Sequence, residues 1–213
     1  MLTLLFAVIF VACLGFLYPE GIWSNALRLI NLVMAGLIAF NYWEPAAAYA
    51  YSYEPSFTYF WDFLAIWAIF SLSFSVLRAL TDAASRYKVR FLKLADRIGS
   101  GLLSMWIGWL MICFLAATLH MAPLPRESFN GAFVPEKRAA SIFSPDMLWL
   151  GFVQQASMGV YARTPPDDDP ELYVFDPSGD FMPKYAARRS RFEQLVKESN
   201  RLRIHSEEAS EHY

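Results

Sequence analysis

The stretch IGSGLLSMWIGWLMICFLAATL, residues 98–119, decides the fold. It contains no Asp, Glu, Lys or Arg. A helix needs about 20 predominantly apolar residues to cross the hydrocarbon core of a bilayer. A helix of that length in a soluble bundle would carry a charged face at helical spacing. We therefore predict that residues 98–119 form a membrane-spanning helix.

Three further apolar stretches precede this one, and turn signals separate them. The first ends at Pro19-Glu20-Gly21, and the second stops before Glu44-Pro45. The first lacks the basic start of a signal peptide, so we expect it to be a retained helix. The sequence thus predicts an all-α integral membrane protein whose four-helix transmembrane bundle uses the ranges 2–18, 22–43, 57–80 and 98–119.

The composition argues against several other classes of protein. The chain is 56% hydrophobic and has a net charge of -2, which excludes a basic nucleic-acid-binding surface of the usual kind. Cys13 and Cys113 lie inside apolar stretches at different expected depths, so we predict no disulfide between them. The three histidines are scattered without metal-ligand spacing. We expect no cofactor, no metal site and no enzymatic activity.

The basic residues set the expected orientation. The link at 78–97 carries six of them, whereas the link at 44–56 carries two glutamates and no Lys or Arg. Loops rich in Lys and Arg stay in the cytoplasm. We therefore expect the 78–97 link to be cytoplasmic, and the N- and C-termini to lie on the non-cytoplasmic side.

Small residues recur on one face of the fourth stretch. Ser100, Ser104 and Gly108 are four residues apart, so they share a helix face on which another backbone can approach closely. This predicts a helix-packing surface, either inside the chain or between protomers. Asp96 and Arg97 precede it, where an acid favours the helix dipole and a base meets lipid phosphates.

These residues resemble a known pattern. Gly21 opens the second stretch and is followed by Asn25-Ala26-Leu27, while Asp96-Arg97 leads into small residues at four-residue steps. Over residues 1–120 the chain resembles the CvpA, or colicin V production, family of bacterial inner-membrane proteins. It departs from that pattern where Ser100 and Ser104 replace glycine. The resemblance implies a multi-pass inner-membrane protein linked to colicin V production, a toxin biosynthetic process, or to export and envelope physiology.

Polar residues inside the apolar stretches are candidates for function, and these are Asn25, Arg28, Asn31, Asp62 and Arg78. Arg28, Asp62 and Arg78 lie near the expected helix ends, where long side chains reach the interface at little cost. Asn31 lies deeper than Arg28, and we predict that it bonds across helices or lines a polar path.

The chain changes character after Met121. Residues 121–162 contain prolines and an apolar segment, 147–161, which we expect to be an interfacial helix, with a fifth span as the alternative. Residues 163–213 are expected to form a Pro-Asp linker, a short strand at 172–175, a basic helix at 184–204 and a disordered end from Ser206. The basic helix suits anionic lipid or a partner, and equally a solvated position.

These observations favour a non-enzymatic scaffold, or a subunit for assembly or export. Its expected partners are the lipid bilayer and either further copies of itself or another membrane-complex subunit. A channel or transporter component is the alternative, and it would need polar residues along one path through the membrane.

Overall fold

The computed structural model describes residues 2–85, 92–125, 128–131, 144–159 and 174–210. Over these residues the structure is helical and contains no strand. Four helices, one of them extended by a 3-10 turn, are long and apolar enough to cross a membrane, which confirms the predicted all-α membrane protein. The elements in order are α1 (Leu2–Leu17), η1 (Tyr18–Glu20), α2 (Ile22–Tyr53), η2 (Pro55–Phe57), α3 (Thr58–Ala84), α4 (Lys93–Thr118), α5 (Ser128–Gly131), α7 (Pro145–Ser157) and α9 (Phe181–Ser210).

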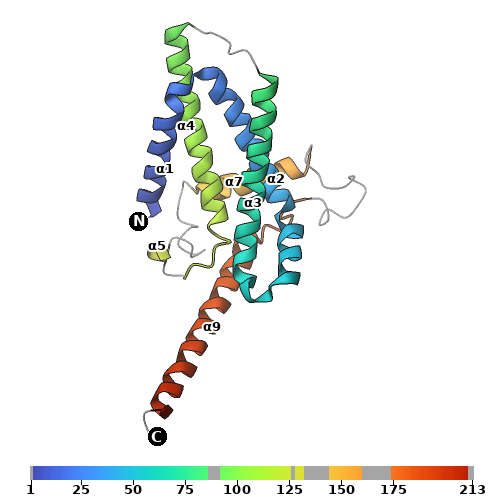
Figure 1. The fold of residues 1–213 in the computed structure, drawn as a ribbon, viewed down its shortest axis with the longest axis vertical. Coiled ribbons are helices and arrows are strands. Elements are labelled where there is room, and N and C mark those ends of the chain that lie inside the picture. Colours follow the sequence, from blue (N-terminus) through green and yellow to red (C-terminus); the bar gives the residue numbers. More distant parts are fainter. Residues whose placement is uncertain (1, 86–91, 126–127, 132–143, 160–173, 211–213) are drawn as a thin grey trace.

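The long helices alternate in direction, as short connections require. Figure 1 shows the end of α1, the start of α2, the end of α3 and the start of α4 together at the upper end of the bundle. We call this the upper end. The turn between α2 and α3 lies at the opposite, lower end, where α9 also projects from the bundle. α2 packs along α3, and α4 packs against both α1 and α2.

Aromatic rings fill the lower half of the bundle. Phe114 of α4 is fully buried, and its ring centroid lies 4.3 Å from Phe70 of α3 and 5.7 Å from Phe40 of α2. Trp149 of α7 lies 5.6 Å from the same ring. Contacts of this kind between rings add stability beyond the burial of their area. One aromatic cluster therefore joins α2, α3, α4 and α7.

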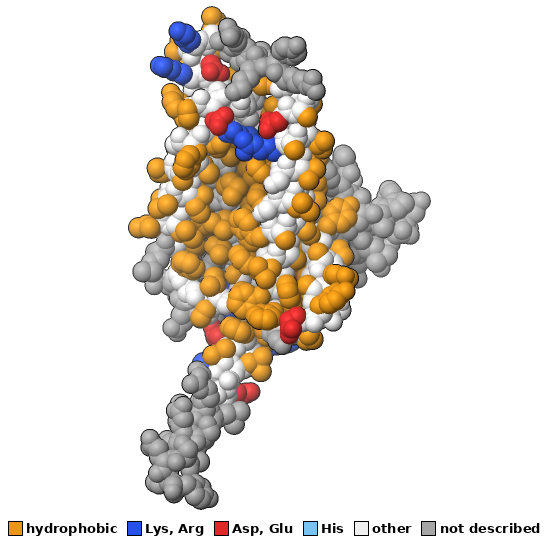
Figure 2. Space-filling view, in the orientation of Figure 1, with side chains coloured by type: hydrophobic (Ala, Val, Ile, Leu, Met, Phe, Trp, Pro, Cys, Tyr) orange, Lys and Arg blue, Asp and Glu red, His pale blue; other side chains and the backbone are white. Residues whose placement is uncertain are grey.

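The outer surface of the bundle is apolar. α1 buries none of its residues, and Leu102 and Trp106 of α4 are 57% and 61% exposed. Figure 2 shows this hydrophobic surface over most of the height of the helices. Exposed apolar surface of this extent is unusual in a soluble monomer and matches contact with lipid chains.

The expected end of the second helix is wrong. α2 does not stop before Pro45 but continues through it to Tyr53, so most of the expected 44–56 link is helical. A proline is tolerated in a membrane helix where neighbouring groups satisfy the freed backbone. Trp43 and Ala47 are both buried, so packing continues across the proline and holds the helix together.

The third and fourth helices are also displaced from their expected ranges. α3 extends to Ala84, beyond the expected end at 80, and α4 begins at Lys93, five residues before the expected start at 98. The expected ranges covered only the apolar residues. The observed ends contain charged residues such as Asp82 and Lys93, because a helix continues beyond the hydrocarbon into the polar region.

α7 covers the bundle and does not cross the membrane as a fifth span. It has 13 residues and lies across the long helices (Figure 1). Trp149, Leu150 and Val153 form its buried face. Gly36 of α2 makes room for it, because a Cβ atom there would lie 2.4 Å from the Trp149 ring. Residues 160 and 161 of the expected segment lie outside the described residues.

The C-terminal region differs from its expected form. Residues 172 and 173 of the expected strand lie outside the described residues, while Val174 and Phe175 form bends with buried side chains and no strand is present in the described part of the chain. The expected linker at 164–169 lies outside the described residues. α9 begins at Phe181 and continues to Ser210, past the expected disorder at Ser206. Asp176 stabilises its start, because its carboxylate accepts the N–H groups of Asp180 and Phe181.

Candidate functional site

Two residues of the family pattern meet at the upper end of the bundle. Gly21 precedes α2 with a φ of +89°, a conformation that suits glycine. The N–H of Ile22, the first residue of α2, donates a 2.9 Å hydrogen bond to the Asp96 carboxylate of α4. Asp96 therefore caps the neighbouring helix α2, where its charge also favours the α2 dipole. A Cβ at position 21 would lie 3.3 Å from the same carboxylate.

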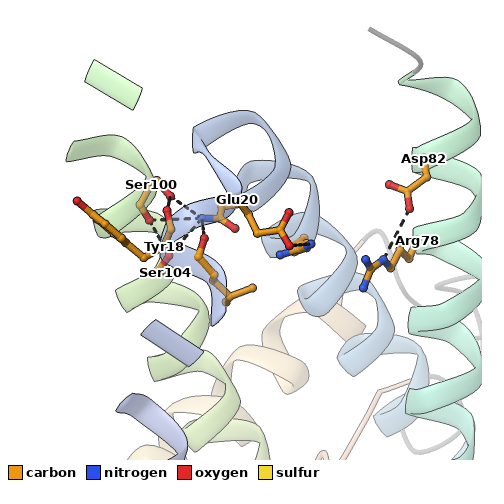
Figure 3. A network of polar contacts seen from close by, with 9 residues as sticks. Tyr18, Glu20, Arg78, Asp82, Ser100 and Ser104 are labelled. Atoms are coloured by element: carbon orange, nitrogen blue, oxygen red, sulfur yellow. Dashed lines mark hydrogen bonds and ion pairs between the residues drawn. The ribbon is translucent and has the colours of Figure 1, made fainter. Parts of the chain in front are cut away.

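Asn25 connects three segments one turn further into the bundle. Its side chain is fully buried, and its Nδ2 donates to the carbonyl of Leu17 at 2.9 Å, to Ser100 Oγ at 2.9 Å and to Ser104 Oγ at 3.2 Å. Ser100 in turn donates to the carbonyl of Tyr18 at 2.7 Å. Figure 3 shows these groups converging between α1, α2 and α4. We call Asn25, Asp96, Ser100 and Ser104 the motif cluster.

The small residues of α4 lie on a face that packs within the chain. Ser100, Ser104 and Gly108 are buried. At Gly108 a Cβ would lie 3.0 Å from the Phe10 ring and 3.4 Å from Cys13, so the glycine lets α1 approach closely. Arg97 differs from these residues, because it is exposed at the upper end and outside the motif cluster.

A polar pocket lies beside the motif cluster, between α2 and α3. Its volume is about 230 Å³, and it is lined by ten residues: Glu20, Trp23, Ser24, Leu27, Arg28, Asn31, Arg78, Thr81, Asp82 and Ser85. Arg28 pairs with Glu20 at 2.9 Å, and Arg78 lies 3.6 Å from Asp82. The Asn31 Nδ2 donates to Thr81 Oγ1 at 2.9 Å, which joins α2 to α3. We call this the arginine pocket.

A second buried polar group lies at the lower end, around Asp62 of α3. Tyr51 donates to one carboxylate oxygen, and Tyr185 of α9 donates to the other at 2.9 Å. Arg188 of α9 forms an ion pair with the same carboxylate and donates to Tyr51 at 2.8 Å. Its guanidinium also lies 5.4 Å from the Tyr59 ring centroid. We call Tyr51, Asp62, Tyr185 and Arg188 the tail clasp.

Burial keeps the Tyr185 phenol of the tail clasp protonated. Removal of Tyr185 from water, followed by the nearby Asp62 carboxylate, raises the pKa of Tyr185 well above its ordinary value. The phenol therefore remains a hydrogen-bond donor at every physiological pH. The basic helix was expected to contact anionic lipid or a partner, or else to be solvated, whereas Arg188 binds Asp62 within the chain.

Arg189, the next residue, reaches a different part of the bundle. It is buried and donates to the carbonyls of Leu119 and His120 at 3.3 and 2.9 Å, beyond the end of α4. The His120 ring lies 2.8 Å from the Asp146 carboxylate at the start of α7. These contacts hold α7 and α9 against the lower end of the four spans.

The buried polar side chains of the bundle join one helix to another. Each polar cluster bridges segments that are far apart in the sequence: α1, α2 and α4 above, and α2, α3 and α9 below. Among the described residues, no group of three or more His, Cys, Asp or Glu side chains could hold a metal ion. The sequence predictions placed Ser100 and Ser104 together but did not identify Asn25 as the residue that connects them.

Comparison with known proteins gives one family. No curated protein and no solved structure matches the chain. The family model described as "Colicin V production protein" matches residues 2–148, which include all four spans, the motif cluster and the start of α7. The tail clasp takes Tyr185 and Arg188 from beyond the matched region. The chain therefore belongs to the colicin V production protein family.

Proposed function

We propose that the protein is a non-enzymatic scaffold of the bacterial inner membrane that serves an assembly or export process in toxin production. The single observation that carries this proposal is the use of its buried polar side chains. Asn25 bonds to α4, Asn31 bonds to α3, and Asp62 bonds to α9. Such bonds fix one helix against another and stabilise a membrane bundle. A rigid bundle of this kind suits a role in holding other membrane proteins.

The proposed orientation places the upper end of the bundle in the cytoplasm. The link at 78–97 joins α3 to α4 at this end and carries six basic residues. The lower end, with the tail clasp and α9, then lies outside the cytoplasm. The four spans found among the described residues are an even number, which agrees with both termini being on that side.

The apolar exterior supports contact with other membrane proteins. Leu148 on the outward face of α7 is 55% exposed, and Trp106 on α4 is 61% exposed. An extended apolar surface can meet lipid chains or a partner protein within the membrane. The proposed partner is a second copy of the chain or another subunit of a membrane complex.

Photo-cross-linking in intact membranes tests the scaffold. A photoreactive phenylalanine analogue is placed at Trp106 or Leu148, and the same analogue at the buried Phe114 provides the matched internal control. The scaffold predicts a discrete adduct of higher protein mass from an exposed position and none from Phe114. Adducts of lipid mass alone at both exposed positions would contradict the proposal.

A channel or transporter component remains the second candidate, and the arginine pocket favours it. The pocket contains charged side chains and reaches Asn31, two to three turns into α2. A conducting path would have to continue from Asn31 toward the lower end, where Phe40, Phe70 and Phe114 fill the space between the helices. Solute flux through the purified protein in liposomes separates this candidate from the scaffold.

A further inference from the structure

We propose that the arginine pocket binds the phosphoethanolamine headgroup of a zwitterionic phospholipid at the upper membrane surface. The pocket lies between the start of α2 and the end of α3 and carries two guanidinium groups and two carboxylates. In the described part of the chain, the ion pair of Arg78 with Asp82 lies within α3 and joins no separate segments. A ligand of this class goes beyond the proposed scaffold role, which does not depend on it.

The charges in the pocket match the headgroup. Arg78 can donate to phosphate oxygens, for which the planar guanidinium fork is well suited, and the Arg28 guanidinium adds positive charge beside it. Asp82 can accept from the ammonium group, so the pocket offers both signs of charge. Its four charged side chains sum to zero, which fits a headgroup with no net charge better than an anionic one.

The geometry leaves two of these charges available. Arg28 is tightly paired with Glu20 at 2.9 Å, whereas the Arg78 Nε lies 3.6 Å from the Asp82 carboxylate. Direct charge-assisted bonds are shorter, about 2.7–2.9 Å. The side chains of Arg78 and Asp82 are also 52% and 70% exposed, so both can turn toward a ligand. In Figure 3, Arg78 extends from α3 toward Glu20, with Asp82 one turn above.

The size and surroundings of the pocket also fit a lipid. Its volume of about 230 Å³ exceeds that of a cavity of about 150 Å³ that takes up benzene. Phosphoethanolamine has only a few more heavy atoms than benzene. Below the charged groups the surface is apolar, as Figure 2 shows. The acyl chains of a bound lipid would lie along this surface.

Native mass spectrometry of the full chain in detergent tests the proposal. Phosphatidylethanolamine and phosphatidylglycerol with identical acyl chains are added in turn, and bound lipid is counted. We expect phosphatidylethanolamine to bind preferentially, and Arg78→Gln and Asp82→Asn each to weaken its binding about tenfold. Both side chains are exposed, so neither variant should impair folding. Arg97→Gln, an exposed arginine at the same end but outside the pocket, is the matched control.

Three results would overturn the proposal. The first is equal or stronger binding of phosphatidylglycerol, which would assign the pocket to anionic lipid. The second is binding that Arg78→Gln, Asp82→Asn and Arg97→Gln leave equally unchanged. The third is displacement of the lipid by soluble phosphoethanolamine at concentrations comparable to those of the lipid, which would assign the pocket to the free headgroup compound.

Discussion

Replacement of Asn25 with leucine tests how the motif cluster stabilises the bundle. The leucine side chain has the same branched skeleton of four non-hydrogen atoms as asparagine, with methyl groups that are larger than the amide oxygen and nitrogen, so it approximates the shape of this fully buried side chain without its hydrogen bonds. The substitution removes the Nδ2 donor that contacts Leu17, Ser100 and Ser104. An amide nitrogen has only two hydrogens, so these three contacts amount to two full hydrogen bonds.

The expected loss follows from those two bonds. Hydrogen bonds between membrane helices contribute about 0.6 kcal/mol on average and about 1.7 kcal/mol at most. Ser100 and Ser104 keep their own bonds to the carbonyls of Tyr18 and Ser100, so no hydroxyl is left without a partner. Asn25→Leu should therefore lower the free energy of unfolding by about 1 to 2 kcal/mol.

The assay is reversible unfolding in mixed micelles with increasing dodecyl sulfate, followed by tryptophan fluorescence. Ser75→Leu on the exposed face of α3 is the matched control, since its hydroxyl bonds only within its own helix. A double-mutant cycle between Asn25→Leu and Ser104→Ala should give a coupling of about 0.6 kcal/mol. If Asn25→Leu unfolds like Ser75→Leu, the motif cluster does not hold α1, α2 and α4 together.

Ser104→Leu should reduce the abundance of the folded protein in membranes, because the added atoms enter the buried face of α4 that contacts α2; unchanged abundance on immunoblots would exclude this face as a packing surface. Arg188→Gln should release α9 from Asp62 and increase the cleavage of α9 by added protease, whereas Arg191→Gln at an exposed position of the same helix should not. Equal cleavage of α9 in the two variants would show that the tail clasp does not hold this helix. For the orientation, single cysteines are placed at Ala84 or Ser52 after the two native cysteines are replaced. An impermeant thiol reagent should label position 84 from the cytoplasmic side and position 52 from the outer side, and cytoplasmic labelling at position 52 would overturn the proposed orientation.

The sequence was sufficient to predict the membrane-spanning helices. A long helix without charged residues, such as 98–119, is stable in the hydrocarbon core of a bilayer, and its length determines whether it crosses that core. The ends of the helices were harder to predict. Helix α2 passes through Pro45 because Trp43 and Ala47 are buried on either side of it, and such tertiary packing is not visible in a local pattern.

The contacts between distant segments could not be predicted for the same reason. Asp62 and Arg188 each lay near an expected helix end, and nothing in either local sequence identified the other as its partner. Gly36 and Trp149 are a similar pair, since a glycine in an apolar helix does not indicate which side chain fills the space above it. A useful signal was present in α9, where Phe181 and Tyr185 lie four residues apart and Arg188 and Arg189 follow, a pattern suited to docking rather than to solvent.

The central claim is that the polar side chains of this bundle join helices and do not line a path through the membrane. Flux through the purified full-length chain in sealed liposomes tests it most directly, with ion and small-solute gradients imposed in both directions and protein-free liposomes as the reference. The claim predicts flux equal to that of the protein-free liposomes, because aromatic rings around Phe114 fill the bundle below Asn31. Saturable flux that Asn31→Leu abolishes would contradict it.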